Sequence, residues 1–199
     1  LGDTGWRVRK VAAHRPVACG GQAPVQEMLV ASLADGENPG RRNSAFEALV
    51  GCGPRATARL VDEMSTDDAD VRKLVIAALA AIGDPTARRP LVEALDDHDP
   101  NIRAAAVEAL GVLGGSQEIE RLIAVASQRE EEVLVRLSAL RSLSRLEAGV
   151  GVSRLTSALD ESLLRPALYQ LLAHSVDPAA HEILLKGLSA TGRSSREGA

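Results

Sequence analysis

The sequence predicts an all-α fold, a right-handed α-solenoid of about six stacked helical hairpins. Three observations lead to this prediction. The chain of 199 residues is 45% hydrophobic but only 2% aromatic, which suits thin layers of helices packed through Ala, Leu, Val and Ile. A pattern of about 31 residues recurs along the chain. No segment shows the alternation of apolar and polar residues that marks a half-buried strand.

An arginine marks the same position in each repeat. Counting from it, an apolar residue follows at three, Ala-Leu at six and seven, and glycine at eleven. The pattern is clearest in RNSAFEALVGCG, RKLVIAALAAIG and RAAAVEALGVLG, which begin at Arg42, Arg72 and Arg103. It is looser after the three other anchors, which are Arg9, Arg136 and Arg165.

Each repeat is expected to be a helical hairpin, and the hairpins form one array over residues 1–190. The units are residues 1–36, 37–65, 66–96, 97–127, 128–160 and 161–190. A hairpin of about 30 residues cannot bury its apolar stripes alone, so the hairpins are expected to stack. Residues 191–199 (TGRSSREGA) lack apolar periodicity and are predicted to be a disordered tail.

Helix boundaries are marked by capping residues. An Asp-Pro pair supplies an N-cap and a first helical residue. Such pairs occur at Asp84-Pro85, Asp99-Pro100 and Asp177-Pro178. The glycine at position eleven is expected to end each first helix in the left-handed conformation.

The segment GCGPRA, Gly51–Ala56, has the outline of a dinucleotide-binding turn. That turn needs a strand before it, but the preceding AFEALV aligns with segments predicted to be helical. Gly53 also aligns with Gly83 and Gly114. The segment is therefore interpreted as the turn between two helices.

Two segments resemble a short bacterial HEAT-like repeat, of the type named after phycobilisome lyases. They are residues 99–111 (DPNIRAAAVEALG) and residues 84–95 (DPTARRPLVEAL), the second with an internal proline. The resemblance implies a scaffold that binds partners. It also implies a structural role for the repeat arginines, which would pair with loop carboxylates or carbonyls. Asp68, Asp70 and Asp99 are the expected neighbours.

Cys19 and Cys52 both stand ten residues after an anchor, in an apolar position of the repeat. Stacked helices lie about 8–10 Å apart, whereas a disulfide needs a Cα separation of roughly 4.4–6.8 Å. Both are therefore predicted to be reduced core residues.

No cofactor or metal site is expected. The four histidines form no spaced ligand set. Deoxyhypusine hydroxylases, which resemble this fold, use several His-Glu pairs, and this chain has the single pair His181-Glu182. No Gly-x-Ser-x-Gly elbow is present.

The net charge and the hydropathy of the chain limit the classes of partner that it is expected to bind. With 23 Lys and Arg against 27 Asp and Glu, the formal net charge is −4, which opposes a broad basic face for nucleic acid. The longest apolar run, residues 74–82, is far shorter than the about 20 residues of a membrane span. We expect neither nucleic acid nor membrane as a partner, and a cytoplasmic location.

The chain is expected to be a fragment. Leu1 stands eight residues before its anchor, as Met64 and Leu95 stand before theirs. Because Met64 and Leu95 close second helices, a further repeat is expected to precede residue 1 in a longer protein.

The second helices are expected to line a concave surface. Leu60 and Leu91 would face the core, together with Val61, Met64 and Ala94. Charged neighbours would point outward to form a docking groove for a protein or peptide of complementary charge. These candidate partner-binding residues are Arg55, Arg59, Asp62, Glu63, Arg88, Arg89, Glu93, Glu118 and Arg121.

The function predicted from these features is a non-enzymatic protein–protein interaction scaffold within a larger bacterial protein. Two alternatives stay open. One is a subunit similar to a bilin lyase, associated with an enzyme. The other is a purely structural spacer between flanking domains.

Overall fold

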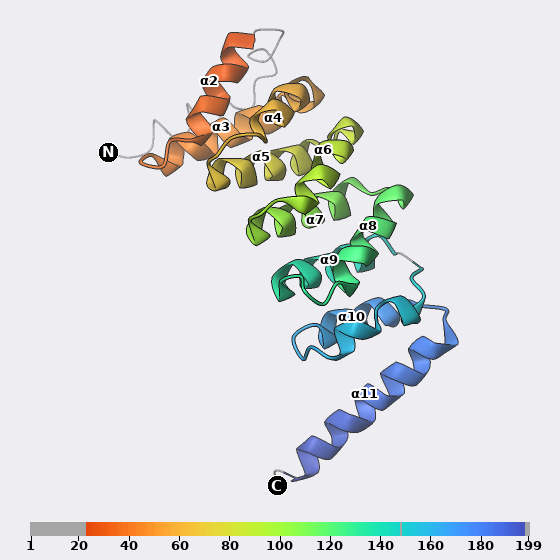
Figure 1. Cartoon of the computed structure of the whole chain (residues 1–199). Helices are drawn as coiled ribbons and strands as arrows, with labels where there is room; N and C mark the ends of the chain where they lie inside the picture. Colours follow the sequence, from red (N-terminus) through yellow and green to blue (C-terminus); the bar gives the residue numbers. More distant parts are fainter. Residues whose placement is uncertain (1–22, 148, 198–199) are drawn as a thin grey trace. The chain divides into compact units, whose positions relative to one another are not determined.

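The protein is described by a computed structural model, which covers residues 23–147 and 149–197. These residues form α-helices and short 3-10 helices, with no strand among them (Figure 1). The predicted all-α fold is confirmed. The chain divides into two compact units, Leu1–Leu113 and Gly114–Ala199. The predicted fourth hairpin, residues 97–127, therefore contributes one helix to each unit.

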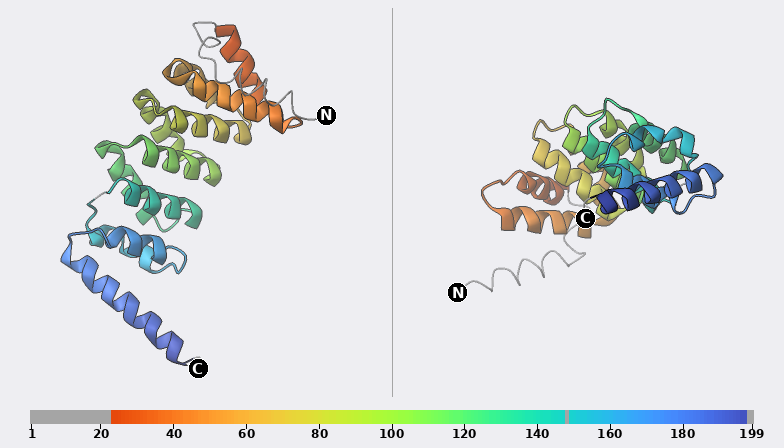
Figure 2. Two further views of the ribbon diagram at one scale, coloured as in Figure 1. Left: turned by 180° about the vertical axis from the view of Figure 1, so that it is seen from behind. Right: turned by 90° about the horizontal axis from the view of Figure 1, so that it is seen from below.

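The first unit consists of two helix layers. The first-helix layer holds α3 (Pro39–Gly51), α5 (Ala69–Ile82) and α7 (Pro100–Leu113). In this layer α3 packs on α5, and α5 on α7 (Figures 1 and 2). The second-helix layer holds α2 (Ala23–Leu33), α4 (Thr57–Glu63) and α6 (Arg88–Glu93). Each of these helices contacts the first helix that follows it.

The second-helix layer is extended by short 3-10 turns. η2 (Gly53–Ala56) leads into α4, and η3 (Pro85–Ala87) and η4 (Ala94–Asp96) flank α6. Pro90 lies inside α6 and has no N–H to donate to the helix ladder. This element is therefore one short α-helical segment between two tighter turns.

Side-chain caps start α5 and η3, the second at an Asp-Pro pair that the sequence predicts. Asp68 precedes α5 and accepts hydrogen bonds from the N–H groups of Asp70 and Val71. Asp84 precedes η3, where the backbone N–H of Thr86 holds the pKa of its carboxyl below the ordinary value of 3.8. Such caps satisfy N–H groups that have no partner within the helix.

The left-handed turn predicted eleven residues after the anchor is present in four successive repeats. Gly53, Gly83 and Gly114 have φ of 61°, 74° and 68°. The fourth repeat of this series has Glu147 instead, with φ of 49°. The backbone keeps the turn although the residue that favours it is missing. GCGPRA is accordingly a helix–helix turn, as predicted.

Leucine and other aliphatic side chains fill the space between the layers of the first unit. From the first-helix layer, Leu49 and Leu79 are fully buried. From the second-helix layer, Leu60 and Leu91 are fully buried too. Burying one such side chain contributes about 1.5–3 kcal/mol, so the stacked stripes supply most of the stability.

The second unit contains α8 (Ser116–Ser127), α9 (Val133–Arg145), α10 (Arg165–Leu172) and α11 (Pro178–Glu197). α8 packs on α9, α9 on α10, and α10 on α11. The predicted second helix of the fifth repeat is instead two 3-10 turns, η5 (Val152–Arg154) and η6 (Thr156–Leu159).

α10 and α11 approach each other closely at Gly187. A Cβ atom at this position would lie 2.7 Å from Cζ of Tyr169, so any other residue here would displace the Tyr169 ring. α11 itself continues to Glu197, whereas the sequence predicts a disordered tail from residue 191. No proline interrupts this segment, and an existing helix extends at low cost because each added residue gains one bond.

Cys52 directly follows α3, is 8% exposed and is disulfide-bonded. Its predicted burial is confirmed, but the prediction that it is reduced is wrong. That prediction used the spacing between helix axes, which does not limit the separation of side chains at helix ends. Cys19, the other cysteine of the sequence, lies outside the described residues, as does the start of the predicted first repeat.

Candidate partner-binding surface

The second-helix face of the first unit is formed by α4 and by α6 with its flanking turns. Leu60 and Leu91 are buried beneath it, as predicted. Val61, Met64 and Ala94, which were also expected to face inward, are half-buried at the surface. This face therefore exposes part of its apolar stripe.

The predicted charged residues of η2 and α4 lie at the surface. Arg55 and Asp62 are exposed, and the Arg55 carbonyl accepts a hydrogen bond from Gln26 Nε2 at 3.1 Å. Arg59 and Glu63 form an ion pair at 2.8 Å, with 32% and 24% of their side chains exposed. Positive and negative charges thus alternate along this helix.

On α6, Arg89 and Glu93 form an exposed ion pair at 3.1 Å. Arg88 differs from the prediction because it does not point freely into solvent. Its Nη2 donates to the carbonyl of Leu113 at 3.2 Å, at the end of α7. Because the last carbonyls of a helix have no partner within it, Arg88 has a structural contact here.

In the second unit, Glu118 is buried, with 7% of its surface exposed. The expectation that it is presented to a partner is wrong. Glu118 stands four and eight residues before Leu122 and Ala126, which are fully buried, and this spacing puts all three on one helix face. Arg121 is exposed, as predicted.

A further ion pair lies on the same unit, between Glu120 and Arg154. Arg154 Nη1 and Nη2 donate to the two carboxylate oxygens of Glu120 at 2.9 and 2.8 Å. These hydrogen bonds lower the pKa of the Glu120 carboxyl below its ordinary value. The two residues lie 34 positions apart, so no local pattern in the sequence indicates the contact.

A pocket of about 370 Å³ opens on the second-helix face between α4 and α6. We call it the α4–α6 pocket. Its apolar lining consists of Val61, Met64, Ile76, Pro90, Ala94 and Ile102. Its polar lining consists of Ser65, Arg72, Glu93, Asp96 and Asp97. Of these residues, only Glu93 was predicted to bind a partner.

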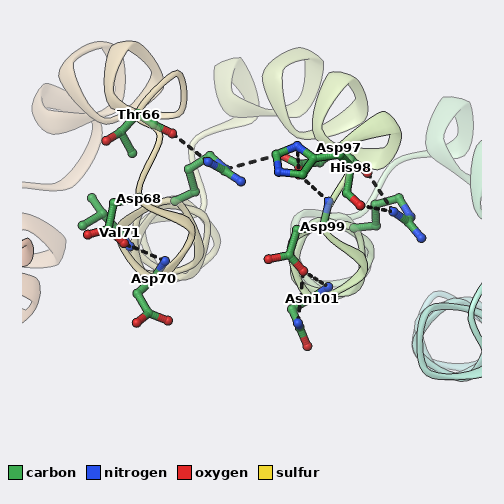
Figure 3. Close-up of polar contacts among 10 residues, drawn as sticks. Thr66, Asp68, Asp70, Val71, Asp97, His98, Asp99 and Asn101 are labelled. Carbon is green, nitrogen blue, oxygen red and sulfur yellow. Dashed lines mark hydrogen bonds and ion pairs between the residues drawn. The ribbon is translucent and has the colours of Figure 1, made fainter.

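Asp97 joins two repeats in the loop before α7 (Figure 3). Its Oδ2 lies 3.3 Å from Nε of Arg72, and its carbonyl accepts from Nη1 of Arg103 at 2.8 Å. Its Oδ1 accepts from the backbone N–H of Asp99 at 2.8 Å. Nη1 of Arg72 also donates to the carbonyl of Thr66 at 2.7 Å. These contacts fix one wall of the α4–α6 pocket.

Four of the repeat arginines have the structural role that the resemblance implied. Arg72, Arg103 and Arg165 each donate to the carbonyl six residues earlier, at 2.7, 2.8 and 2.8 Å. Arg136 is 2% exposed and donates to the carbonyl of Ala126 at 3.2 Å. Arg72 and Arg103 thus connect their helices to the preceding loop, whereas Arg136 connects α9 to α8 and Arg165 connects α10 to η6.

The carboxylate neighbours expected for the repeat arginines were only partly right. Asp68 caps α5 rather than pairing with Arg72, and Asp70 is an exposed residue of the first turn. Asp97 forms the ion pair instead. It belongs to the loop of the next repeat, which the sequence does not place next to Arg72.

Asp99 interacts with Arg72 through charge alone. Its main partner is Asn101, whose backbone N–H donates to Asp99 Oδ1 at 2.8 Å and holds the pKa of that carboxyl below 3.8 (Figure 3). The positive charge of Arg72 lowers this pKa further, by a smaller amount.

Among residues 23–147 and 149–197, no group of three or more His, Cys, Asp or Glu residues is arranged to hold a metal ion.

None of the helices in the described part of the chain is long and apolar enough to cross a membrane.

A sequence model of HEAT repeats matches residues 57–144, from the start of α4 to within α9. No curated protein sequence matches the chain. The family match confirms the resemblance carried by residues 84–95 and 99–111.

Several solved structures match this chain. The complex of CpcE and CpcF of phycocyanin lyase from Nostoc sp. PCC7120 contains a chain that is 23% identical, with a TM-score of 0.56, over 82% of this chain and 98% of that one. Human deoxyhypusine hydroxylase is 17% identical, with a TM-score of 0.49, over 87% and 81% of the chains. An engineered protein is 19% identical, with a TM-score of 0.45, over 88% and 94%. Together with the HEAT match, the first of these confirms the predicted α-solenoid.

Proposed function

Because residues 57–144 of this chain are HEAT repeats, we propose that the protein is a non-enzymatic scaffold that binds a protein or peptide on its second-helix face. The α4–α6 pocket is the observation that carries this proposal. It combines half-buried apolar side chains with charged residues on one face, which is the anatomy of a protein-binding surface.

The candidate residues that support this surface are now fewer than the sequence suggested. In the first unit they are Arg55, Arg59, Asp62, Glu63, Arg89 and Glu93. Arg88 is excluded because it bonds to the end of α7. Arg121 belongs to the second unit, and we keep it as a separate candidate.

The experiment is a site-specific photo-crosslink in lysate of the organism that makes the protein. A photoreactive amino acid replaces Arg89 on α6, or Lys73 as the control on α5. Both side chains are exposed, but they belong to different layers. We expect a discrete crosslinked protein from position 89 only.

The same crosslink should survive nuclease treatment, because the partner is proposed to be a protein. Equal crosslinking from both positions, or from position 73 alone, would contradict a docking role for the second-helix face. Loss of the product after nuclease treatment would indicate nucleic acid instead.

A second candidate function is that of a lyase-associated subunit. It is favoured by the fold shared with a chain of the CpcE–CpcF complex. Co-expression with a phycobiliprotein and a bilin would then give a coloured covalent adduct. If no coloured adduct forms but position 89 crosslinks to a protein, the result would favour the scaffold over the lyase-associated subunit.

The cytoplasmic location is still a prediction, and one observation argues against it. Cys52 is disulfide-bonded, and disulfides are rare in reducing compartments. Fractionation of cells that produce the full-length protein would decide this point.

A further inference from the structure

We propose that the α4–α6 pocket accepts an aliphatic side chain of a partner peptide in which lysine or arginine stands beside that side chain. This inference rests on the proposed function and names the chemistry of the partner. It is carried by the apolar floor of the pocket, by the carboxylates at its edge and by the burial of its only lining cation.

The floor of the pocket is aliphatic and preformed. Ile76 of α5 and Ile102 of α7 line it, and each is only 1% exposed. Val61 and Met64 line the pocket from the α4 side, and Ala94 from η4. At about 370 Å³ the pocket is near the lower limit for small-molecule sites, a size suited to a side chain and its adjoining backbone.

Carboxylates dominate the polar lining. Glu93 and Asp96 are exposed, and Asp97 is half-buried. Among the described residues, Arg72 is the only basic one that lines the pocket, and only 8% of its side chain is exposed. Arg72 and Asp97 are paired at 3.3 Å and offset each other, so the negative charge at the edge comes from Glu93 and Asp96.

The ion pair of Glu93 does not prevent it from binding a partner. Its contact with Arg89 is solvent-exposed on both sides, at 90% and 66%, and pairs of this kind contribute little. A lysine or arginine of a bound peptide can therefore replace Arg89 next to Glu93. An acidic peptide would meet repulsion at the same edge.

The test begins with selection of random twelve-residue peptides, displayed on phage, against the whole chain. We expect enrichment of sequences in which Leu, Ile or Met stands next to Lys or Arg. The affinity of one enriched peptide is then measured by calorimetry. Replacing its aliphatic residue by serine should weaken binding about 10- to 100-fold.

Two variants connect the binding to the pocket. Ala94→Phe fills it, and Glu93→Lys reverses a charge at its edge without changing a buried residue. We expect Glu93→Lys to weaken the enriched peptide about fivefold or more. Glu47→Lys on α3, another exposed glutamate, is the matched control and should have no effect.

Enrichment of acidic or uncharged peptides would overturn this inference, and so would binding that neither pocket variant changes. In those cases the scaffold proposal would survive if Arg89 still forms its photo-crosslink. If no peptide is enriched and position 89 gives no crosslink, both proposals fail.

Discussion

Arg72 and Arg42 occupy the same position in successive repeats, yet their surroundings differ. Arg72 is 7% exposed, donates to the carbonyl of Thr66 and pairs with Asp97. The Arg42 side chain is half-buried and makes no polar contact with the described residues. A mutation at each position therefore shows how much of the free energy of unfolding comes from the polar contacts of Arg72 and how much from having an arginine at this position of the repeat.

We predict that Arg72→Met lowers the free energy of unfolding by about 2–4 kcal/mol, because it leaves Asp97 without its cation and the Thr66 carbonyl without its donor. Arg42→Met keeps a similar aliphatic stem and should change stability by less than about 0.5 kcal/mol. Urea unfolding of both variants measures the difference. An equal loss at the two positions would mean that packing of the stem, not the polar contacts, is what matters.

Single residues also show where inference from the sequence fails. Arg88 and Glu118 were both expected to be exposed on second helices. Arg88 reaches the end of α7, and Glu118 lies on the same face as Leu122. The contacts of a long side chain depend on which residues pack next to it. The periodic pattern of the sequence does not show which residues these are.

At the scale of elements, the turn after the first helix of each repeat is the most consistent feature. It keeps a positive φ at Gly53, Gly83, Gly114 and Glu147. Three of these residues are glycine, which adopts this conformation freely. Glu147 pays a steric penalty, because its Cβ crowds the following carbonyl in the left-handed region.

We predict that Glu147→Gly stabilises the protein by up to about 1 kcal/mol, which is the steric relief less the extra entropy of glycine in the unfolded chain. Glu147→Ala retains the Cβ atom and is the control, with no expected gain. Thermal unfolding distinguishes the two, since about 1 kcal/mol corresponds to roughly 2–4 °C for a chain of this size. A similar gain from alanine would instead point to the loss of the Glu147 charge.

The second helices vary more than these turns. α6 contains Pro90 and is flanked by η3 and η4, and the fifth repeat has only η5 and η6 at this place. The sequence contains the signal for the first case, because the internal proline is visible in RRPLVEAL. It gives no direct sign that a pocket opens beside α6.

At the scale of the whole molecule, the division into Leu1–Leu113 and Gly114–Ala199 bears on how stability is distributed. Stacked repeats interact mainly with their neighbours, so a local loss of packing spreads only over adjacent repeats. Leu143 of α9 is fully buried in the second unit, and its truncation tests this expectation.

We predict that Leu143→Ala costs about 2–5 kcal/mol locally and that hydrogen exchange reveals where. Protection should fall most in α8, α9 and α10 and least in α3. Val75→Ala on α5, which is fully buried in the first unit, should produce the reverse pattern. Uniform loss of protection along the chain in both variants would show that the two units unfold as one.

The sequence alone determined the helical hairpins, their period and the left-handed turns. These features are local, or they recur every 30 or so residues, so one chain contains several copies of the same signal. Only the tertiary structure decided that Arg72 pairs with Asp97, that Glu120 meets Arg154 and that a pocket lies between α4 and α6. Such contacts depend on which side chains of different repeats face each other, and that is fixed by the stacking of helices rather than by the pattern within any one of them.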